Sequence, residues 1–179
     1  MLNRSFKDFK FQHKKNKNQI LYTSVNVKDD SEILNLIDTF LNEKNSFIFE
    51  SVEKGKIKGR YTIFGKNPDK IWEFNNNSCA LIAGNKKQKI KGTPRKNIEK
   101  IIEEFNFKTP KELPPICSLI SGYFSYDVIR YIEKIPNNNK DDLNIPDARI
   151  LRPRNLIIHD NIKKKLYFIV NVFKDEKIK

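Results

Sequence analysis

The sequence predicts an α+β protein with a mostly antiparallel sheet and flanking helices. Short segments rich in β-branched and aromatic residues alternate with turn-forming residues, a pattern typical of antiparallel strands. Two longer segments carry apolar residues at helical spacing. With 13 Phe and 6 Tyr among 179 residues, the chain can form a hydrophobic core although 32% of its residues are charged.

The chain begins with a Lys- and Asn-rich lead-in over 1–18, which we expect to be loosely held. A first strand is predicted over 19–27. A helix is predicted from Asp30 or Ser31 to about Lys44, because either residue can be its N-cap and the apolar residues that follow share one face. Those residues are Ile33, Ile37, Phe40 and Leu41.

An antiparallel meander is predicted next, because short apolar segments are separated by turn formers such as Asn67-Pro68-Asp69 and Gly84-Asn85. The expected strands are 46–52, 60–66, 70–74 and 79–83. A second helix is predicted after this meander. Thr93 can cap it, Pro94 suits its first position, and apolar residues from Ile98 to Phe105 form one stripe.

The C-terminal part is predicted to contain a buried strand over 116–124 and a short helix from Ser125 or Asp127 to about Ile132. A polar loop over 136–146 follows. A hairpin is predicted last, with strands over 155–159 and 165–172. No internal repeat or second domain boundary is visible, so a single domain is predicted over 19–179.

The net charge of +13 raises the hypothesis of a basic, non-enzymatic module that binds nucleic acid. Lys outnumbers Arg roughly four to one, however, and Arg is the better side chain for bidentate phosphate or guanine contacts. The lysines are scattered, with short runs such as Lys163-Lys164-Lys165. Abundant Lys, Asn and Ile together are typical of an AT-rich genome. We therefore favour a solvated lysine surface with no nucleic-acid or membrane partner, and keep the basic module as the alternative.

The two cysteines, Cys79 and Cys117, are isolated and lack metal-ligand spacing, although a disulfide between them is conceivable. The first residues lack the apolar core of a signal peptide, and no apolar run approaches the roughly 20 residues of a membrane-spanning helix. We therefore predict a cytoplasmic protein.

Common catalytic motifs are not found in the sequence, which has no Gly-rich phosphate loop, HExxH or GxSxG. We expect His13 and His159 to be solvent-exposed or at a sheet edge, and Asp141-Asp142 to lie in a solvated turn. No catalytic or metal-binding residue is therefore assigned.

Glu50-Ser51 is the most suggestive polar pair, because it follows the apolar Phe47-Ile48-Phe49 and precedes a turn. A carboxylate at this position can bind the ammonium of an amino acid, while the hydroxyl and nearby backbone can bind its carboxylate. The alternative interpretation is that the two side chains simply end a strand.

Four segments taken together resemble the N-terminal region of anthranilate synthase component I, a chorismate-utilising family. They are Ile48-Phe49-Glu50-Ser51, the run from Gly59 to Gly65, the run from Gly122 to Asp127 with Arg130 to Glu133, and Pro146-Asp147-Ala148-Arg149 with Arg152-Pro153. The resemblance extends from about Ile20 to Val172. Aminodeoxychorismate synthase component I has similar motifs and remains an alternative.

The resemblance implies that this region is part of a two-sheet sandwich and one wall of a feedback site for L-tryptophan. Ser51 is the first residue implied as a tryptophan contact, followed by Glu50 and then Arg60. Phe47 and Phe49 replace two aliphatic residues of the family, and Thr62 replaces its usual Ser.

The family enzyme is a lyase of tryptophan biosynthesis that converts chorismate and glutamine-derived ammonia to anthranilate and pyruvate. By this resemblance, its chorismate-binding half and its Mg²⁺ lie outside the present sequence, so this segment is expected to be inactive alone. The implied partners are L-tryptophan, the glutamine amidotransferase component II and the C-terminal chorismate-binding half.

The run from Gly122 to Glu133 is interpreted as structural. Ser125 replaces a Gly of the family, which predicts that its backbone needs no positive φ. Asp127 and Arg130 are three residues apart and can form an ion pair across one helical turn, and Arg130 can also interact with Glu133.

Overall fold

The computed structural model describes residues 2–15, 17–28, 31–50, 59–76, 78–105, 107–136, 138 and 140–176. The chain divides into two compact units. The first unit comprises 1–68, 107–119 and 153–179, and the second comprises 69–106 and 120–152. Strands β3 (Tyr61–Asn75) and β7 (Ala148–Asp160) contribute to both units. Hydrophobic periodicity does not reveal this division, because both strands continue through it without a break.

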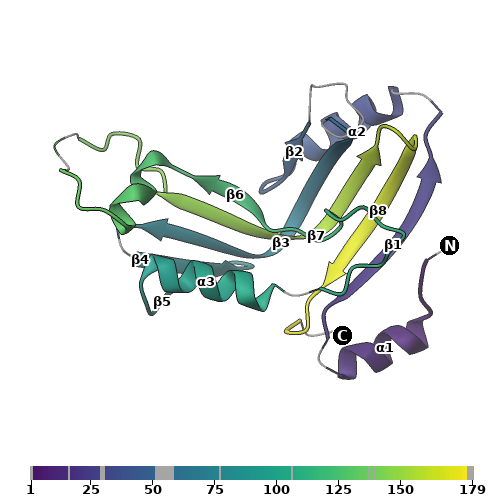
Figure 1. Cartoon of the computed structure of the whole chain (residues 1–179), viewed down its shortest axis with the longest axis horizontal. Helices are drawn as coiled ribbons and strands as arrows, with labels where there is room; N and C mark the ends of the chain where they lie inside the picture. The colour runs from purple at the N-terminus through teal and green to yellow at the C-terminus, as the bar shows by residue number, and fades with distance from the viewer. Residues whose placement is uncertain are drawn as a thin grey trace. The chain divides into compact units, whose positions relative to one another are not determined.

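The first unit is built on strands in the order β1-β8-β7-β3, with β2 also paired to β3. Its own elements are α1 (Phe6–Lys14), β1 (Gln19–Asn26), α2 (Ser31–Leu41), β2 (Phe47–Phe49) and β8 (Lys165–Val172). Strand β8 pairs antiparallel with β1 on one side and with β7 on the other, as Figure 1 shows.

The sheet of the first unit buries side chains on both faces. Leu156 and Ile158 of β7 pack in one cluster with residues of the 107–119 segment, which crosses β7 and β8 in Figure 1. Ile157 points the opposite way and packs in a second cluster with Ile33 and Phe40 of α2. Because both faces are covered, β7 carries three consecutive apolar residues, Leu156, Ile157 and Ile158, in this unit.

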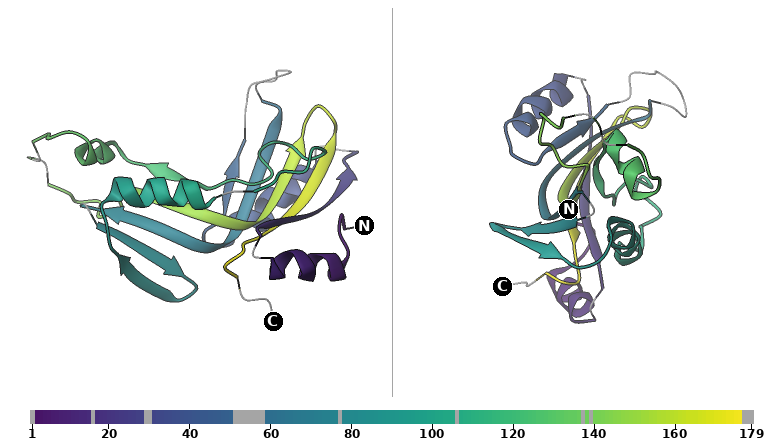
Figure 2. Two further views of the ribbon diagram at one scale, coloured as in Figure 1. Left: turned by 60° about the horizontal axis from the view of Figure 1, so that its bottom comes forward. Right: turned by 90° about the vertical axis from the view of Figure 1, so that its left-hand side faces the viewer.

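The second unit has strands in the order β7-β3-β4-β5, with β6 paired to β7. Its own elements are β4 (Ser78–Ala83), β5 (Lys86–Ile90), α3 (Pro94–Glu104), β6 (Ser121–Phe124) and the 3₁₀ helix η1 (Tyr126–Tyr131). Figures 1 and 2 show α3 lying along these strands. Its Ile101 joins a buried cluster with Trp72, Phe74, Cys79, Ala148 and Ile150.

The predicted α+β class is confirmed, and elements with strong local signals lie where they were expected. Thr93 caps α3, its side chain accepting a hydrogen bond from the Lys96 N–H at 3.4 Å, and Pro94 begins the helix. The C-terminal hairpin forms with Asp160 opposite Lys165. Helix α2 begins at Ser31, whereas the other suggested cap, Asp30, lies outside the described residues.

Two expectations about strands were wrong, and one strand was not expected. The turn expected at Asn67-Pro68-Asp69 is absent from β3, where Asn67 instead adopts φ +55° within a continuous strand. The strand expected over 116–124 is limited to β6, because the chain turns before it and the Cys117 N–H donates to the Pro114 carbonyl at 3.0 Å. Strand β5 was not predicted, because its Lys-rich sequence lacks apolar alternation and pairing with β4 stabilises it instead.

The loosely held lead-in was also a wrong expectation, because it contains α1. The Ser5 hydroxyl caps this helix by accepting from the Asp8 N–H at 3.2 Å. Gln19 of β1 donates to the Phe9 carbonyl at 3.2 Å and accepts from Arg4 at 2.9 Å. These bonds hold the helix against the first strand.

Both cysteines are free and buried, and they lie in different units. Burial raises the pKa of the Cys79 thiol to about 11. No helix in the described part of the chain is long and apolar enough to cross a membrane.

Candidate functional site

The candidate site lies in the first unit, where β2 ends and β3 begins. The two strands are antiparallel, with Phe47 opposite Gly65 and Phe49 opposite Ile63. Gly65 allows this pairing, because a Cβ there would lie 2.1 Å from the Phe47 ring. Glu50 follows the last residue of β2 and is exposed, so its carboxylate is accessible at this end of the strand pair.

Arg60, which immediately precedes β3, forms an ion pair with the last residue of β7. Its Nε donates to Asp160 Oδ1 at 3.1 Å and its Nη2 donates to Asp160 Oδ2 at 2.7 Å. The Asp160 side chain is 1% exposed and the Arg60 side chain is 28% exposed. This bidentate geometry fixes the plane of the guanidinium, with its carbon 4.9 Å from the centre of the Tyr61 ring.

The turn between β7 and β8 makes hydrogen bonds to Asp160 and to the residues that precede β3. Asp160 Oδ1 also accepts from the N–H groups of Ile162 and Lys163, each at 3.1 Å. The Asn161 N–H donates to the Arg60 carbonyl at 2.8 Å, and its side-chain amide donates to the Gly59 carbonyl at 3.3 Å. The start of β3 is therefore attached to this turn by side-chain and main-chain bonds.

Opposing effects act on the pKa of Asp160. Burial raises the pKa, whereas the bonds from Arg60 and from the backbone N–H groups of Lys163 and Ile162 lower it. The lowering effects prevail, so Asp160 is ionised at neutral pH with its pKa below the usual value. The folded state therefore favours the ionised form of this buried carboxylate.

Asp160 should make stability depend on pH. An unfolded Asp has a pKa of about 3.9, and the folded pKa is lower, so the stabilisation is complete above the unfolded value and is lost as the pH falls through the folded one. We expect Asp160→Asn to lower the free energy of unfolding by about 2 kcal/mol at pH 7. Urea denaturation should show this difference shrinking toward pH 3. Exposed Asp38→Asn is the control, and a constant Asp160→Asn difference would contradict the assignment.

The structure places two of the three predicted tryptophan residues. Ser51 lies outside the described residues. Glu50 and Arg60 lie at the same end of the β2–β3 pair, and their binding of tryptophan stays a prediction. Asp160 and Asn161 were missed by sequence reasoning, because a contact across about a hundred residues has no local signal. The one signal in the sequence was that Asp160 closely follows the apolar segment from Leu156 to Ile158.

The second motif has a structural role in the second unit. Gly122 must be glycine because a Cβ there would lie 2.0 Å from the Arg149 carbonyl oxygen of the paired strand. Of the two partners suggested for Arg130, Asp127 forms an ion pair with it at 2.7 Å. Ser125 has φ −73°, so the prediction that it needs no positive φ is confirmed.

Asp147, in the third matching segment, connects several elements of the second unit. Its N–H donates to the Phe74 carbonyl at 2.8 Å, and its carboxylate accepts from the Asn76 N–H at 2.8 Å. The Tyr131 hydroxyl donates to the same carboxylate at 2.5 Å. Burial and then this bond raise the pKa of Tyr131 far above its usual value. These contacts explain the motif without a catalytic role.

The remaining candidates do not form a catalytic cluster in the described residues. His159 is 2% exposed, so the expectation of an exposed or edge position was wrong; β7 lies between two other strands. A ring nitrogen of His13 lies 3.1 Å from the Glu176 carbonyl oxygen. Asp141 and Asp142 are exposed, as expected. No three His, Cys, Asp or Glu side chains in the described ranges could hold a metal ion, and Mg²⁺ binding elsewhere stays a prediction.

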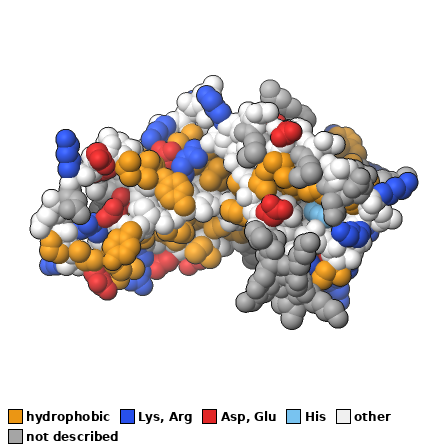
Figure 3. Space-filling view, turned by 90° about the horizontal axis from the view of Figure 1, so that it is seen from above, with side chains coloured by type: hydrophobic (Ala, Val, Ile, Leu, Met, Phe, Trp, Pro, Cys, Tyr) orange, Lys and Arg blue, Asp and Glu red, His pale blue; other side chains and the backbone are white. Residues whose placement is uncertain are grey.

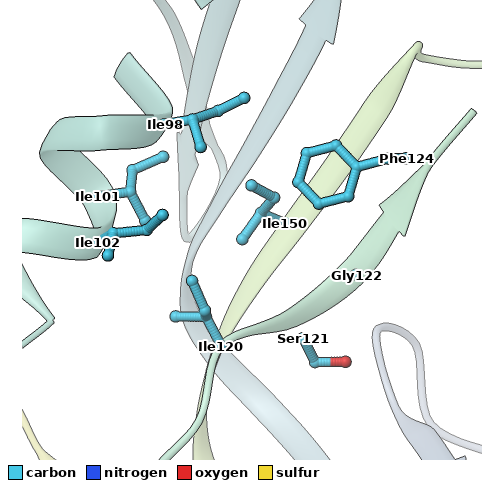
Figure 4. A pocket seen from close by; sticks show the side chains of 8 residues that line it. All are labelled: Ile98, Ile101, Ile102, Ile120, Ser121, Gly122, Phe124 and Ile150. Atoms are coloured by element: carbon cyan, nitrogen blue, oxygen red, sulfur yellow. The ribbon is translucent and has the colours of Figure 1, made fainter. Parts of the chain in front are cut away.

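The second unit also contains an apolar cleft of about 240 Å³ between α3 and the strands β6 and β7. Figure 4 shows the isoleucines and Phe124 around it, with Ser121 as the polar side chain in the view. None of the described residues that line the cleft is ionisable. Lys and Arg side chains are scattered over the face seen in Figure 3 rather than gathered in one patch.

These observations define an α+β protein with a mostly antiparallel sheet, an ion pair between Arg60 and Asp160, and an exposed Glu50 after the last residue of β2. No protein-family model matches the chain. The chain is related in sequence to anthranilate synthase component I. It is 32% identical over 164 residues to anthranilate synthase component 1 of Cereibacter sphaeroides, covering 89% of this chain and 33% of that protein.

Another relative and a solved structure point to the same family. The chain is 32% identical over 155 residues to anthranilate synthase component 1 of Acetivibrio thermocellus, covering 86% of this chain and 31% of that protein. The crystal structure of anthranilate synthase component I from Streptococcus pneumoniae matches the fold with a TM-score of 0.57 at 21% identity, over 87% of this chain and 33% of that chain. The resemblance inferred from the motifs is confirmed, and the chain spans about a third of the length of these relatives.

Proposed function

We propose that this chain forms the N-terminal regulatory and scaffold portion of an anthranilate synthase component I, a lyase of tryptophan biosynthesis. The observation that carries the proposal is 32% identity to a relative of that name along 89% of this chain. The order of the motifs adds support, because the segments around Glu50, Arg60 and Gly122 follow the family pattern. The relatives described above support anthranilate synthase over aminodeoxychorismate synthase.

In this proposal, the end of the β2–β3 pair binds L-tryptophan. Ser51, Glu50 and Arg60 would contact the amino acid, and the contacts of Asp160 with Arg60 give the site a rigid side. Tryptophan would inhibit by binding one conformation of the enzyme more tightly than the other. A coupling free energy of about 1–3 kcal/mol is typical of such control.

The chemistry itself would take place outside this segment. Chorismate, Mg²⁺ and ammonia from the glutamine amidotransferase component II would be handled by the C-terminal half of a cytoplasmic enzyme. The 179-residue chain alone should therefore produce no anthranilate from chorismate and ammonium. Anthranilate formation by the chain alone would contradict this part of the proposal.

A fusion enzyme tests the proposal directly. Residues 1–179 would replace the matching third of the Cereibacter sphaeroides relative, and anthranilate fluorescence would be followed with chorismate and ammonium. We expect an active enzyme that L-tryptophan inhibits. Ser51→Phe should fill the site, leaving activity intact while raising the half-inhibiting tryptophan concentration about tenfold or more.

Ser31→Phe is the control for the added bulk, because Ser31 is exposed at the start of α2 and is not among the residues proposed to contact tryptophan. Its inhibition should equal that of the unsubstituted fusion. Unchanged inhibition in Ser51→Phe would remove Ser51 from the site. An active fusion that ignores tryptophan altogether would overturn the regulatory role.

A further inference from the structure

We propose that strand β6 and the apolar cleft beside it form an interface that accepts an added β-strand, supplied by the remaining part of the enzyme. The inference rests on the proposed function, because it takes this chain to be one portion of a longer component I. It assigns the surface at which the other portion docks and the kind of side chain that enters the cleft.

The first observation concerns the outer edge of β6, which is the edge that does not face β7. In the described part of the chain, β6 pairs with β7 alone. The Ser125 N–H donates to the Asp147 carbonyl at 2.7 Å, and hydrogen-bonded residues alternate along an antiparallel pair. The main-chain groups of Gly122 and Phe124 are therefore directed away from β7, where an extended segment can pair with them.

The second observation is that the two outer strands of this unit, which Figure 1 shows as β5 and β6, differ in charge. Strand β5 carries the exposed Lys86, Lys87 and Lys89. Lysines on an outer strand oppose pairing with a further strand, which would have to bury their charge. Strand β6 has no charged residue and exposes Tyr123 and Phe124. The uncharged, apolar edge at β6 is therefore the one suited to pairing.

The third observation is the cleft next to β6. Figure 4 shows Phe124 on one side of it, the isoleucines of α3 on the other, and Ile150 between them. Phe124 is 56% exposed and Ile102 of α3 is 58% exposed, so a further apolar side chain placed here would bury area on both. The cleft of about 240 Å³ is large enough to hold such a side chain.

Gly122 indicates which residue of the added strand enters the cleft. Residues directly opposite each other in an antiparallel pair place their side chains next to each other on the same face. Because Gly122 has no side chain, a large apolar or aromatic side chain opposite it can lie across its backbone and reach Ile150. Aromatic residues compensate for glycine in this way in other sheets. An uncharged side chain is required, because none of the described residues that line the cleft is ionisable.

The length of β6 favours the rest of the enzyme over a second copy of this chain as the occupant. With four residues, β6 offers few main-chain hydrogen bonds, so pairing between free molecules would be weak. Pairing within one polypeptide is favoured by the high effective concentration of its segments. This chain covers 33% of the Cereibacter sphaeroides relative, so most of that protein is available to supply the strand.

Amide hydrogen exchange tests the pairing without any substitution. The full 179-residue chain is compared with the fusion enzyme, in which residues 1–179 replace the matching third of the Cereibacter sphaeroides relative. We expect the peptide that contains β6 to exchange about tenfold or more slowly in the fusion, because its outer N–H groups become hydrogen-bonded. The peptide that contains β5 is the control and should exchange at the same rate in both proteins.

Maleimide labelling tests the cleft. Ile102→Cys places an accessible thiol at its rim, and Lys89→Cys on β5 is the exposed control. Because a thiol must be accessible to react, Ile102→Cys should be labelled about tenfold or more slowly in the fusion than in the 179-residue chain. Lys89→Cys should be labelled equally in both. Mass spectrometry of the labelled peptides separates these thiols from the buried Cys79 and Cys117.

The outcomes are distinguishable. Slower exchange in β6 together with slower labelling at position 102 supports the interface. Equal rates in either measurement, in a fusion that forms anthranilate, would overturn the inference and leave the proposed function standing. Protection that is present in the 179-residue chain and rises with its concentration would make a second copy the occupant and also overturn it. A fusion that is protected at β6 but forms no anthranilate would count against the proposed function alone.

Discussion

Gly122→Ala should lower the free energy of unfolding by about 3 kcal/mol, because the added methyl group overlaps the backbone of the neighbouring strand. The Cβ would lie 2.0 Å from the Arg149 carbonyl oxygen, which a rotamer change cannot relieve. Strand β6 would have to separate from β7 at the pair formed by Gly122 and Ile150. Trp72, the single tryptophan, is 6% exposed in the core of the second unit, so its fluorescence during urea denaturation reports this loss.

Gly84→Ala provides the control for Gly122→Ala. Gly84 lies in the β4–β5 turn with φ +56°, and a Cβ there has no neighbouring atom within 4 Å. The substitution therefore adds only the backbone cost of a left-handed conformation, about 1 kcal/mol. Equal destabilisation by the two substitutions would show that the β6–β7 contact is not as close as the structure indicates.

Arg152→Leu should be the second strongly destabilising change, because it leaves the Asp69 carboxylate buried without its partner. The Arg152 Nε lies 2.8 Å from Asp69 Oδ1, and its Nη2 bonds the other carboxylate oxygen. The side chains are 10% and 6% exposed. Breaking a buried ion pair from one side costs about 3–5 kcal/mol, which urea denaturation should detect.

Replacing both partners tests the reason for this loss. The double variant Asp69→Leu with Arg152→Leu removes both charges, so it should recover a large part of the stability lost in Arg152→Leu. Arg95→Leu is the exposed control at 77% side-chain exposure and should change stability by less than about 0.5 kcal/mol. A double variant as unstable as the single one would show that packing by the Arg152 stem, rather than charge, is the dominant contribution.

The elements that could be predicted have strong signals within a few residues. Helix α3 has a capping Thr, a Pro at its first position and an apolar stripe, and each of these acts locally. The β7–β8 hairpin combines two apolar segments with a polar turn. Helix α1 was missed because its apolar pattern is weak, and bonds from Arg4 and Gln19 stabilise it against β1.

Turn signals were misleading where strand pairing opposed them. Asn67-Pro68-Asp69 is a typical turn sequence, yet β3 continues through it because neighbouring strands hold its backbone on both sides of this position. Strand β5 is the opposite case. Its Lys-rich sequence lacks a strand pattern, yet it forms a strand because its backbone pairs antiparallel with β4. Hydrogen-bonded pairing between distant segments overrode local preference in both cases.

The sequence by itself determined the α+β class, the capped helix, the terminal hairpin and the resemblance to anthranilate synthase component I, because these properties depend on residues close together in the chain. It also indicated Ser51, Glu50 and Arg60 as candidate tryptophan contacts, which stays a prediction. Only the tertiary structure decided which groups meet, as in Arg60 with Asp160, Asp69 with Arg152, and Gly122 with Arg149. These contacts depend on the register of strands that are far apart in sequence, and register is set by the packing of the whole sheet.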